Sequence, residues 1–230
     1  MPQAALNERG DIAGENLMIS QKPPDIPGFL VPRTVFRRRG HVQQDISNSL
    51  KELHKSVDVG LHLGAGSSKI EGLLNCDQFD PNADEKIDAV SLRGFENDSV
   101  DLIEHHHMLE HLSFEQCEKA LTEWFRVLKS GGYLVMTFPD ITRVCFHYLK
   151  LRAIDLLWDR SEELDYAIKM LVGSQEHEGM FHKNHFDRKR IKRILPAYGL
   201  EIVFIYPYPN RPTPSTIVVA RKNGNLDRQP

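Results

Sequence analysis

The sequence predicts an α/β fold built on a mostly parallel, doubly wound sheet. Residues 57–66, VDVGLHLGAG, form an apolar segment that ends in a glycine turn, which is the pattern of a strand running into a tight loop. Residues 133–140, YLVMTFPD, are almost continuously apolar, as is typical of a strand buried on both faces. Helical patterns separate such strands along the chain, and this order favours parallel pairing. The 230 residues are enough for one large domain.

One helix and three strands are expected in the first half of the chain. Ile46, Leu50 and Leu53 recur at helical spacing, so residues 43–56 are expected to form an amphipathic helix. The glycine turn leaves room for only a very short helix, within residues 67–73. The strands are expected at residues 57–66, 73–77 and 99–107.

A second helix is expected to begin after Ser113. Ser113 and Gln116 have the spacing of a capping box, in which each side chain bonds the backbone of the other residue. Gly131 stands where the helix needs a left-handed residue at its end. The apolar stripe of this helix consists of Cys117, Leu121, Trp124 and Leu128.

The last third of the chain predicts a helical insertion and a hairpin. Residues 141–186 are longer than a sheet connection requires. Because ligands sit at the carboxyl ends of the strands in such sheets, this insertion is expected to roof the site. A helix is expected after Asp187, kinked or shortened by Pro196. Residues 199–209 and 215–222 are expected to pair as an antiparallel hairpin.

Composition excludes several classes of protein. Apolar residues make up 40%, charged residues 27%, and the net charge is −3, so there is no general attraction for nucleic acid or anionic membranes. Three separated cysteines, with no CxxC pair, argue for a reducing compartment and against a disulfide framework or a cysteine zinc site. No apolar run approaches the roughly 20 residues of a membrane helix. A cytoplasmic location is therefore expected.

The glycine turn predicts a nucleoside ligand without a phosphate. Gly64 and Gly66 are present, but the third glycine of a dinucleotide fingerprint is replaced by Lys69. Asp77 comes 13 positions after Gly64, closer than the roughly 20 of dinucleotide folds, and is placed to accept hydrogen bonds from ribose hydroxyls. No P-loop pattern is present.

Six of the eleven histidines cluster in two places, at residues 105–111 and 182–185. His105, His106 and His107 end a predicted strand, and because faces alternate along a strand, at most two of them can point into the site. His107 is expected to do so, with His105 on its face if the strand persists that far. His107 is the first candidate general base and His182 the second; the alternative is that they order loops.

A metal site is the other interpretation of these histidines. The residues that could supply nitrogen and oxygen ligands are His107, Glu110, His111, His182 and His185. Their spacing singles out no site, and Glu110 and His111 are instead expected to anchor the following helix. No metal is therefore predicted.

Two basic runs are candidates for phosphate contacts. They are RRR at residues 37–39 and RKRIKR at residues 188–193. In the second run, Ile191 and Ile194 alternate with the charges, the pattern of a solvated helix face over a core stripe. Nucleic acid is therefore not the expected partner.

Four motifs follow one another along the chain: LHLGAGSS, NCDQFD, FENDSVDLIEHHHMLEHL and WFRVLKSGGYLVMTFPD. In this order they resemble class I S-adenosylmethionine-dependent methyltransferases, and in particular the small type 11 branch found among carbohydrate and natural-product pathways. The resemblance spans residues 57–140 and continues more weakly through GMFHKNHFD to Gly199.

The resemblance implies a Rossmann-like class I methyltransferase fold and a set of cofactor contacts. Gly64, Ala65 and Gly66 would pack under the methionine part of S-adenosylmethionine, and Asp77 would bind its ribose. The stretch 91–93, with Leu92 and Arg93, would border the adenine, and His106 and His107 would lie near the methyl donor. His62 departs from the pattern, because the wider class often has an acid at this position.

The predicted organisation has one catalytic domain with flanking segments. Residues 1–45 form an amino-terminal arm or lid, residues 46–222 the methyltransferase domain with 141–186 as its cap, and residues 223–230 a tail. The expected reaction transfers a methyl group to an oxygen or nitrogen of a small natural-product or sugar-like molecule and leaves S-adenosylhomocysteine. A homodimer is one option.

Three other functions stay open at this point. They are a non-catalytic binding protein with the same fold, a nicotinamide-dependent oxidoreductase and an RNA methyltransferase. The missing third glycine counts against the oxidoreductase. The replacement of an acid by His62 is the best support for the non-catalytic protein.

Overall fold

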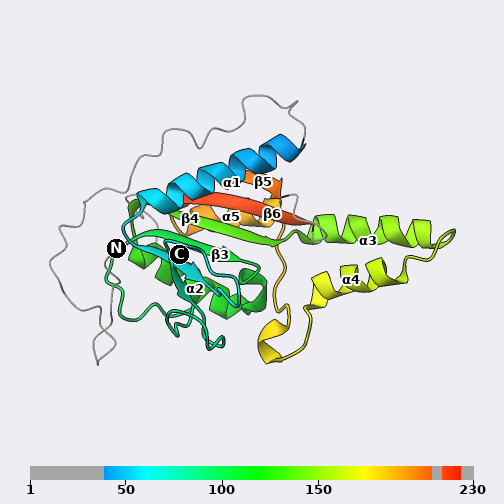
Figure 1. Cartoon of the computed structure of the whole chain (residues 1–230), viewed down its shortest axis with the longest axis horizontal. Coiled ribbons are helices and arrows are strands. Elements are labelled where there is room, and N and C mark those ends of the chain that lie inside the picture. The colour runs from blue at the N-terminus through cyan, green and yellow to red at the C-terminus, as the bar shows by residue number, and fades with distance from the viewer. Residues whose placement is uncertain (1–38, 209–213, 224–230) are drawn as a thin grey trace.

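The computed structural model describes residues 39–208 and 214–223, so most of the predicted arm and the predicted tail lie outside the described residues. The core is one six-stranded sheet with the order β2-β1-β3-β4-β6-β5 (Figure 1). The strands are β1 (Gly60–Leu63), β2 (Leu74–Cys76), β3 (Val100–His106), β4 (Leu128–Pro139), β5 (Leu200–Tyr208) and β6 (Ser215–Lys222).

The sheet is mostly parallel, as predicted. β1 pairs in parallel with both β2 and β3, and β3 pairs in parallel with β4. β6 runs antiparallel to β4 and β5, which confirms the carboxy-terminal hairpin. The parallel strands bring residues 64–66, 77 and 107 to one edge of the sheet, where ligands of such sheets bind.

Helices cover both faces of the sheet. α1 (Arg39–Ser56) lies on one face, where Ile46, Leu50 and Leu53 pack against Val135 and Val219. α2 (Phe114–Val127) and α5 (Arg188–Ala197) cover the other face (Figure 1). α1 starts four residues earlier than the sequence predicts.

The connections from β1 to β2 and from β2 to β3 contain no helix, so the very short helix predicted within residues 67–73 is absent. Turns occupy residues 64–73 and 77–99. The Asn75 side chain replaces the missing helix as the organising element. It accepts a hydrogen bond from the Ile70 N–H at 2.7 Å and donates to the carbonyls of Ile70 and Leu73 at 3.2 and 3.0 Å. Asn75 also donates to Asp84 at 2.9 Å, so one buried amide holds both connections.

The start of α2 is where the sequence predicts it, but the end is not. The capping box of Ser113 and Gln116 is present in both directions. Gly131 does not end the helix, because α2 stops at Val127 and β4 begins at the next residue. Gly131 does have a positive φ of 81°, but within β4, where a Cβ would lie 3.0 Å from the Arg221 guanidinium.

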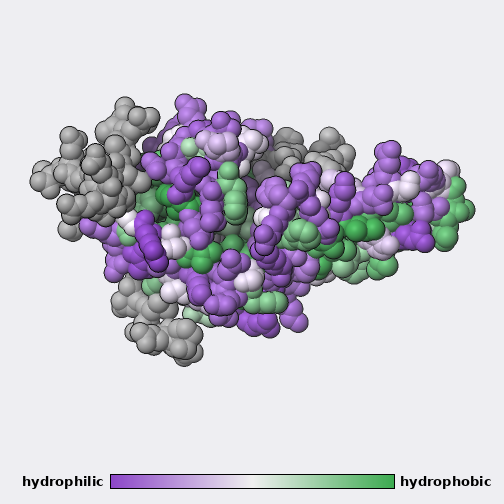
Figure 2. Space-filling model, turned by 90° about the horizontal axis from the view of Figure 1, so that it is seen from below, coloured by the Kyte–Doolittle hydropathy of each residue, from purple (hydrophilic) through white to green (hydrophobic). Residues whose placement is uncertain are grey.

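α3 (Ile141–Asp155) and α4 (Ser161–Val172) form the predicted helical insertion. They pair with each other through Leu151, Leu164 and Ala167, and they extend beyond the strand ends as an arm (Figure 1). Apolar side chains lie exposed along this arm, Phe146 and Trp158 among them (Figure 2). The two helices therefore extend away from the strand ends and do not roof them as predicted, and they bury only part of their apolar surface between them (Figure 1).

The last helix behaves as the sequence predicts. α5 ends one residue after Pro196. Ile191 is fully buried while Arg188, Lys189, Lys192 and Arg193 are exposed, so the basic run is a solvated face. Two 3₁₀ turns, η1 (Leu109–His111) and η2 (Glu178–Met180), complete the described elements. No helix in the described residues is both long and apolar enough to cross a membrane.

Candidate functional site

The glycine turn after β1 opens a space at the carboxyl edge of the sheet. Gly64 and Gly66 have φ values of 64° and 49°, a region that disfavours residues with a Cβ. A Cβ on Gly64 would lie 2.5 Å from Met108 Cγ, so this glycine permits close packing. Around Gly66 a Cβ would meet no atom within 4 Å. Gly66 therefore lets a ligand approach the backbone, and Ala65, which is buried, supports the turn from below.

Asp77 is joined directly to this turn. Its Oδ2 accepts a hydrogen bond from the Gly66 N–H at 2.9 Å, and its Oδ1 accepts from the Phe79 and Asp80 N–H groups at 2.7 and 3.0 Å. Burial by itself would raise the pKa of Asp77, but these backbone hydrogen bonds outweigh it and lower the pKa. The carboxylate is thus ionised, and Oδ2 keeps a lone pair for another donor.

These two features fit the nucleoside of S-adenosylmethionine. The space at Gly66 admits a ligand to the backbone, and the partly exposed Asp77 offers an acceptor for ribose hydroxyls beside it. Both predicted residues therefore lie together at the edge where the resemblance places the cofactor.

His106 belongs to a buried acid–histidine network behind the turn. Glu104 is 1% exposed and accepts hydrogen bonds from His54 Nε2 at 2.6 Å and His106 Nε2 at 2.7 Å. Burial would raise the pKa of Glu104, but the two histidines lower it to about 2. The other His106 nitrogen meets the Thr137 hydroxyl at 3.0 Å. His106 is therefore held rigidly at the end of β3, with its side chain 36% exposed.

His62 does not replace the acid of the wider class as a ligand contact. It is 2% exposed, bonds Asn75 Oδ1 through Nδ1 at 3.0 Å, and its ring lies edge-on to His106, 5.7 Å between centroids. Burial lowers the pKa of His62, which keeps it neutral. Its role is to brace the turn and the His106 ring.

Leu92 and Arg93, which the resemblance places beside the adenine, differ in their burial. The Leu92 side chain is fully buried in the core, its N–H donates to Glu123, and its carbonyl accepts from Arg126. Arg93 is exposed and lines a shallow pocket with Glu118 and Lys119 on the outer face of α2. No residue of the glycine turn lines that pocket. Leu92 therefore has no free group for a ligand.

His107 leaves the strand, so the condition under which His105 would share its face, a strand that persists to residue 107, is not met. β3 ends at His106, and His107 has a positive φ of 51°. His105 instead packs fully buried against the Trp124 ring, with 5.0 Å between centroids. His107 Nε2 lies 3.1 Å from the Ser215 hydroxyl, and Nδ1 lies 3.2 Å from Glu110 Oε1. Its side chain is 31% exposed.

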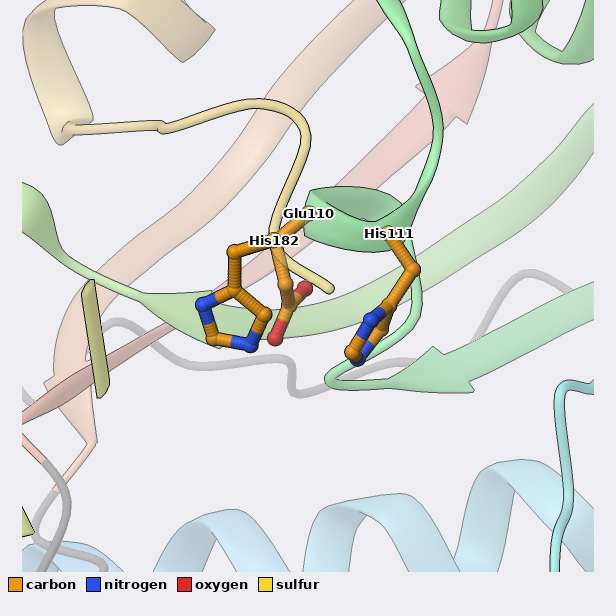
Figure 3. A group of neighbouring side chains, drawn as sticks. All are labelled: Glu110, His111 and His182. Carbon is orange, nitrogen blue, oxygen red and sulfur yellow. The ribbon is translucent and has the colours of Figure 1, made fainter. Parts of the chain in front are cut away.

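His182 comes to the same region from a distant part of the chain. The Lys183 and Asn184 N–H groups donate to the Glu110 carbonyl at 2.9 and 3.1 Å, which ties the segment after α4 to η1. Glu110 carries its carboxylate between the rings of His111 and His182 (Figure 3). Both candidate bases therefore lie around Glu110, although 75 positions separate them in the sequence.

Several residues of this site escaped the sequence reasoning. Glu104 gave a signal, because an acid inside the apolar strand VDLIE needs a buried partner. Ser215 and Thr137 gave none, because they reach the site only through the pairing of β4 with β3 and β6.

The comparison with protein families matches the middle of the chain. Residues 71–136 match the family model described as "Methyltransferase domain". No curated protein matches the chain. The match covers β2, β3, α2 and most of β4, and so includes Asp77 and the histidine-rich end of β3.

Two solved structures share the fold. A SAM-dependent methyltransferase from Archaeoglobus fulgidus has 16% identity over 80% of this chain and 95% of its own, with a TM-score of 0.52. The magnesium protoporphyrin IX methyltransferase of Synechocystis PCC 6803, solved with bound SAH, has 15% identity over 80% of this chain and 84% of its own, with a TM-score of 0.50. Residues 71–136 therefore match a methyltransferase domain, and the chain shares the fold of these two methyltransferases.

Proposed function

We propose that the chain transfers the methyl group of S-adenosylmethionine to an oxygen or nitrogen atom of a small molecule. The observation that carries this proposal is that a cradle suited to a nucleoside lies next to a partly exposed histidine, at the same edge of the sheet. Gly66 and Asp77 supply the cradle, and His107 stands at the end of the neighbouring strand. The substrate would enter from the side of β3 and β4.

The cofactor would be held by the first two strand ends. Asp77 would accept hydrogen bonds from the ribose, and the backbone at Gly66 would pack against the methionine part. When bound, the cofactor supplies an electrophilic methyl group on a sulfonium. The task of the protein is then to hold the nucleophile in line, about 3 Å from that carbon.

His107 would remove the proton of the accepting atom. An oxygen or nitrogen nucleophile often needs such a base, and histidine titrates in the required range. Glu110 Oε1 lies 3.2 Å from His107 Nδ1, beside the ring but without hydrogen-bond geometry. The Ser215 hydroxyl lies 3.1 Å from His107 Nε2 and orients this nitrogen. The contact would break when the substrate binds, which would leave Nε2 free to take the proton.

His107→Asn tests this role with little disturbance of the backbone. Asparagine tolerates the left-handed conformation that His107 adopts, but it is not a base. We expect methyl transfer from labelled S-adenosylmethionine, screened over small molecules with hydroxyl and amino groups, to fall about 10²–10⁴-fold in kcat. Binding of S-adenosylhomocysteine should not change.

The matched control is His177→Asn, an exposed histidine of the segment after α4. Its activity should equal that of the unchanged chain. Equal activity of His107→Asn and His177→Asn would rule out His107 as the base. Transfer to RNA, with none to any small molecule, would replace the proposed substrate class.

A further inference from the structure

The carboxylate of Glu110 is buried without a hydrogen-bond partner. The residue is 2% exposed, and neither Oε1 nor Oε2 has a hydrogen bond in the described part of the chain. His107 Nδ1 lies 3.2 Å from Oε1, but this contact does not have hydrogen-bond geometry. A buried carboxylate in this state is costly unless a cation compensates it. Glu110 therefore indicates an absent positive charge.

Two histidines present lone pairs beside this carboxylate. His111 Nδ1 lies 3.2 Å from the Phe181 carbonyl, and His182 Nδ1 lies 3.1 Å from the Met170 carbonyl. A carbonyl only accepts, so each Nδ1 carries the hydrogen and each Nε2 is left as a potential ligand. Histidines that bind metals are held in this way, with the second ring nitrogen bonded to a carbonyl or carboxylate.

The three side chains are close enough to share one ion. One ligand atom from each of Glu110, His111 and His182 lies within 4.8 Å of the other two, and the carboxylate stands between the two imidazoles (Figure 3). Tetrahedral zinc, with bonds of about 2.0–2.1 Å, holds its ligand atoms about 3.3 Å apart. Small side-chain movements would close that difference, because both histidines are partly exposed.

We propose that Glu110, His111 and His182 form a site for a divalent transition-metal ion, with Zn²⁺ as the best match. Two imidazoles and one carboxylate suit zinc and disfavour Mg²⁺, which prefers oxygen ligands alone. Three protein ligands leave a fourth position for water or for an oxygen of the substrate.

The site would join two parts of the molecule. Glu110 and His111 belong to η1 at the end of β3, whereas His182 follows α4 and is bonded through its N–H to the Val172 carbonyl. A bound ion would fix the base of the α3–α4 arm beside the edge of the sheet. Only the role of the fourth position rests on the proposed function; metal binding does not.

Calorimetry with Zn²⁺ alone tests the site. The protein is prepared without a histidine tag and stripped with a chelator, with Cys145→Ser to remove an exposed thiol. We expect about one zinc ion per chain and a raised melting temperature, and no such response to Mg²⁺. Glu110→Gln and His111→Ala should each weaken zinc binding on the order of 100-fold, with unchanged circular dichroism. His177→Ala, with an exposed histidine outside the site, should bind as before.

Failure to bind zinc would overturn the proposal, and so would equal binding by His111→Ala and His177→Ala. His111 is partly exposed, so His111→Ala is the variant to use if Glu110→Gln does not fold. Titration of the stripped protein with S-adenosylhomocysteine separates this result from the methyl-transfer proposal. Cofactor binding without zinc binding would remove the metal site alone.

Discussion

His105 shows how strongly one buried side chain can couple stability to pH. It is fully buried against Trp124, and neither ring nitrogen has a hydrogen-bond partner in the described residues. Burial, followed by the charges of His106 and His62, lowers its pKa to about 3. The folded protein therefore keeps His105 neutral at pH values where the unfolded chain, with a pKa near 6.5, takes up a proton.

The sign of the effect follows from this difference. Because the unfolded state binds more protons, His105 makes the protein less stable as pH falls from about 6.5 towards 3. We expect His105→Leu to remove this loss of stability. The unfolding free energy of the variant minus that of the unchanged chain should rise by on the order of 2 kcal/mol when the pH is lowered from 8 to 5. Urea unfolding at both pH values measures it. Parallel pH profiles of the two proteins would contradict the explanation.

The contacts of single residues could be predicted from the sequence where both partners lie close together along the chain. Gly66 and Asp77 could be predicted because the turn and the strand end lie 11 positions apart and meet directly. The partners of His107 could not, because a positive φ turns it out of the strand and its contacts come from Glu110 and the distant Ser215.

At the scale of elements, the connection from β1 to β2 is the least usual part of the fold. Parallel strands are normally joined by a dozen or more residues that include a helix. Here ten residues, 64–73, make the crossover without one. The Asn75 amide substitutes for the helix by bonding His62, Ile70, Leu73 and Asp84.

Asn75→Ala is therefore expected to loosen the turn as a whole. Removing the amide leaves the Ile70 N–H and His62 Nδ1 without partners, which costs about 2–3 kcal/mol of unfolding free energy. Binding of S-adenosylhomocysteine should weaken as well. Asn48→Ala, at an exposed position of α1, should change stability by less than about 0.5 kcal/mol. Equal urea midpoints for the two variants would show that Asn75 does not hold the crossover.

Helices and strands were predicted correctly where the pattern of apolar residues was long. The apolar strand at 133–140 and the capping box of Ser113 appear as predicted. The end of α2 did not, because Gly131 takes its left-handed conformation inside β4, with Arg221 packed over it. The placement of the helical insertion failed for a different reason, because a pattern of apolar residues cannot tell whether two helices pack on the core or on each other.

At the scale of the whole molecule, the parallel strands bring the residues of the candidate site together at their carboxyl ends. The glycine turn follows β1, Asp77 follows β2 and His107 follows β3, so three segments that are separate in the sequence meet at one edge. Helices on both faces bury the core behind this edge. The α3–α4 arm extends from the end of β4, and the segment after it returns His182 to the same edge (Figure 1).

Calorimetric titration with S-adenosylhomocysteine, run beside NAD, tests the central claim that this edge holds a phosphate-free nucleoside cofactor. We expect micromolar binding of S-adenosylhomocysteine and none of NAD, because Lys69 stands where a dinucleotide fingerprint has its third glycine. Asp77→Asn should weaken the binding at least about tenfold, since the ribose loses a charged acceptor. Binding of NAD instead, or of neither ligand, would contradict the account.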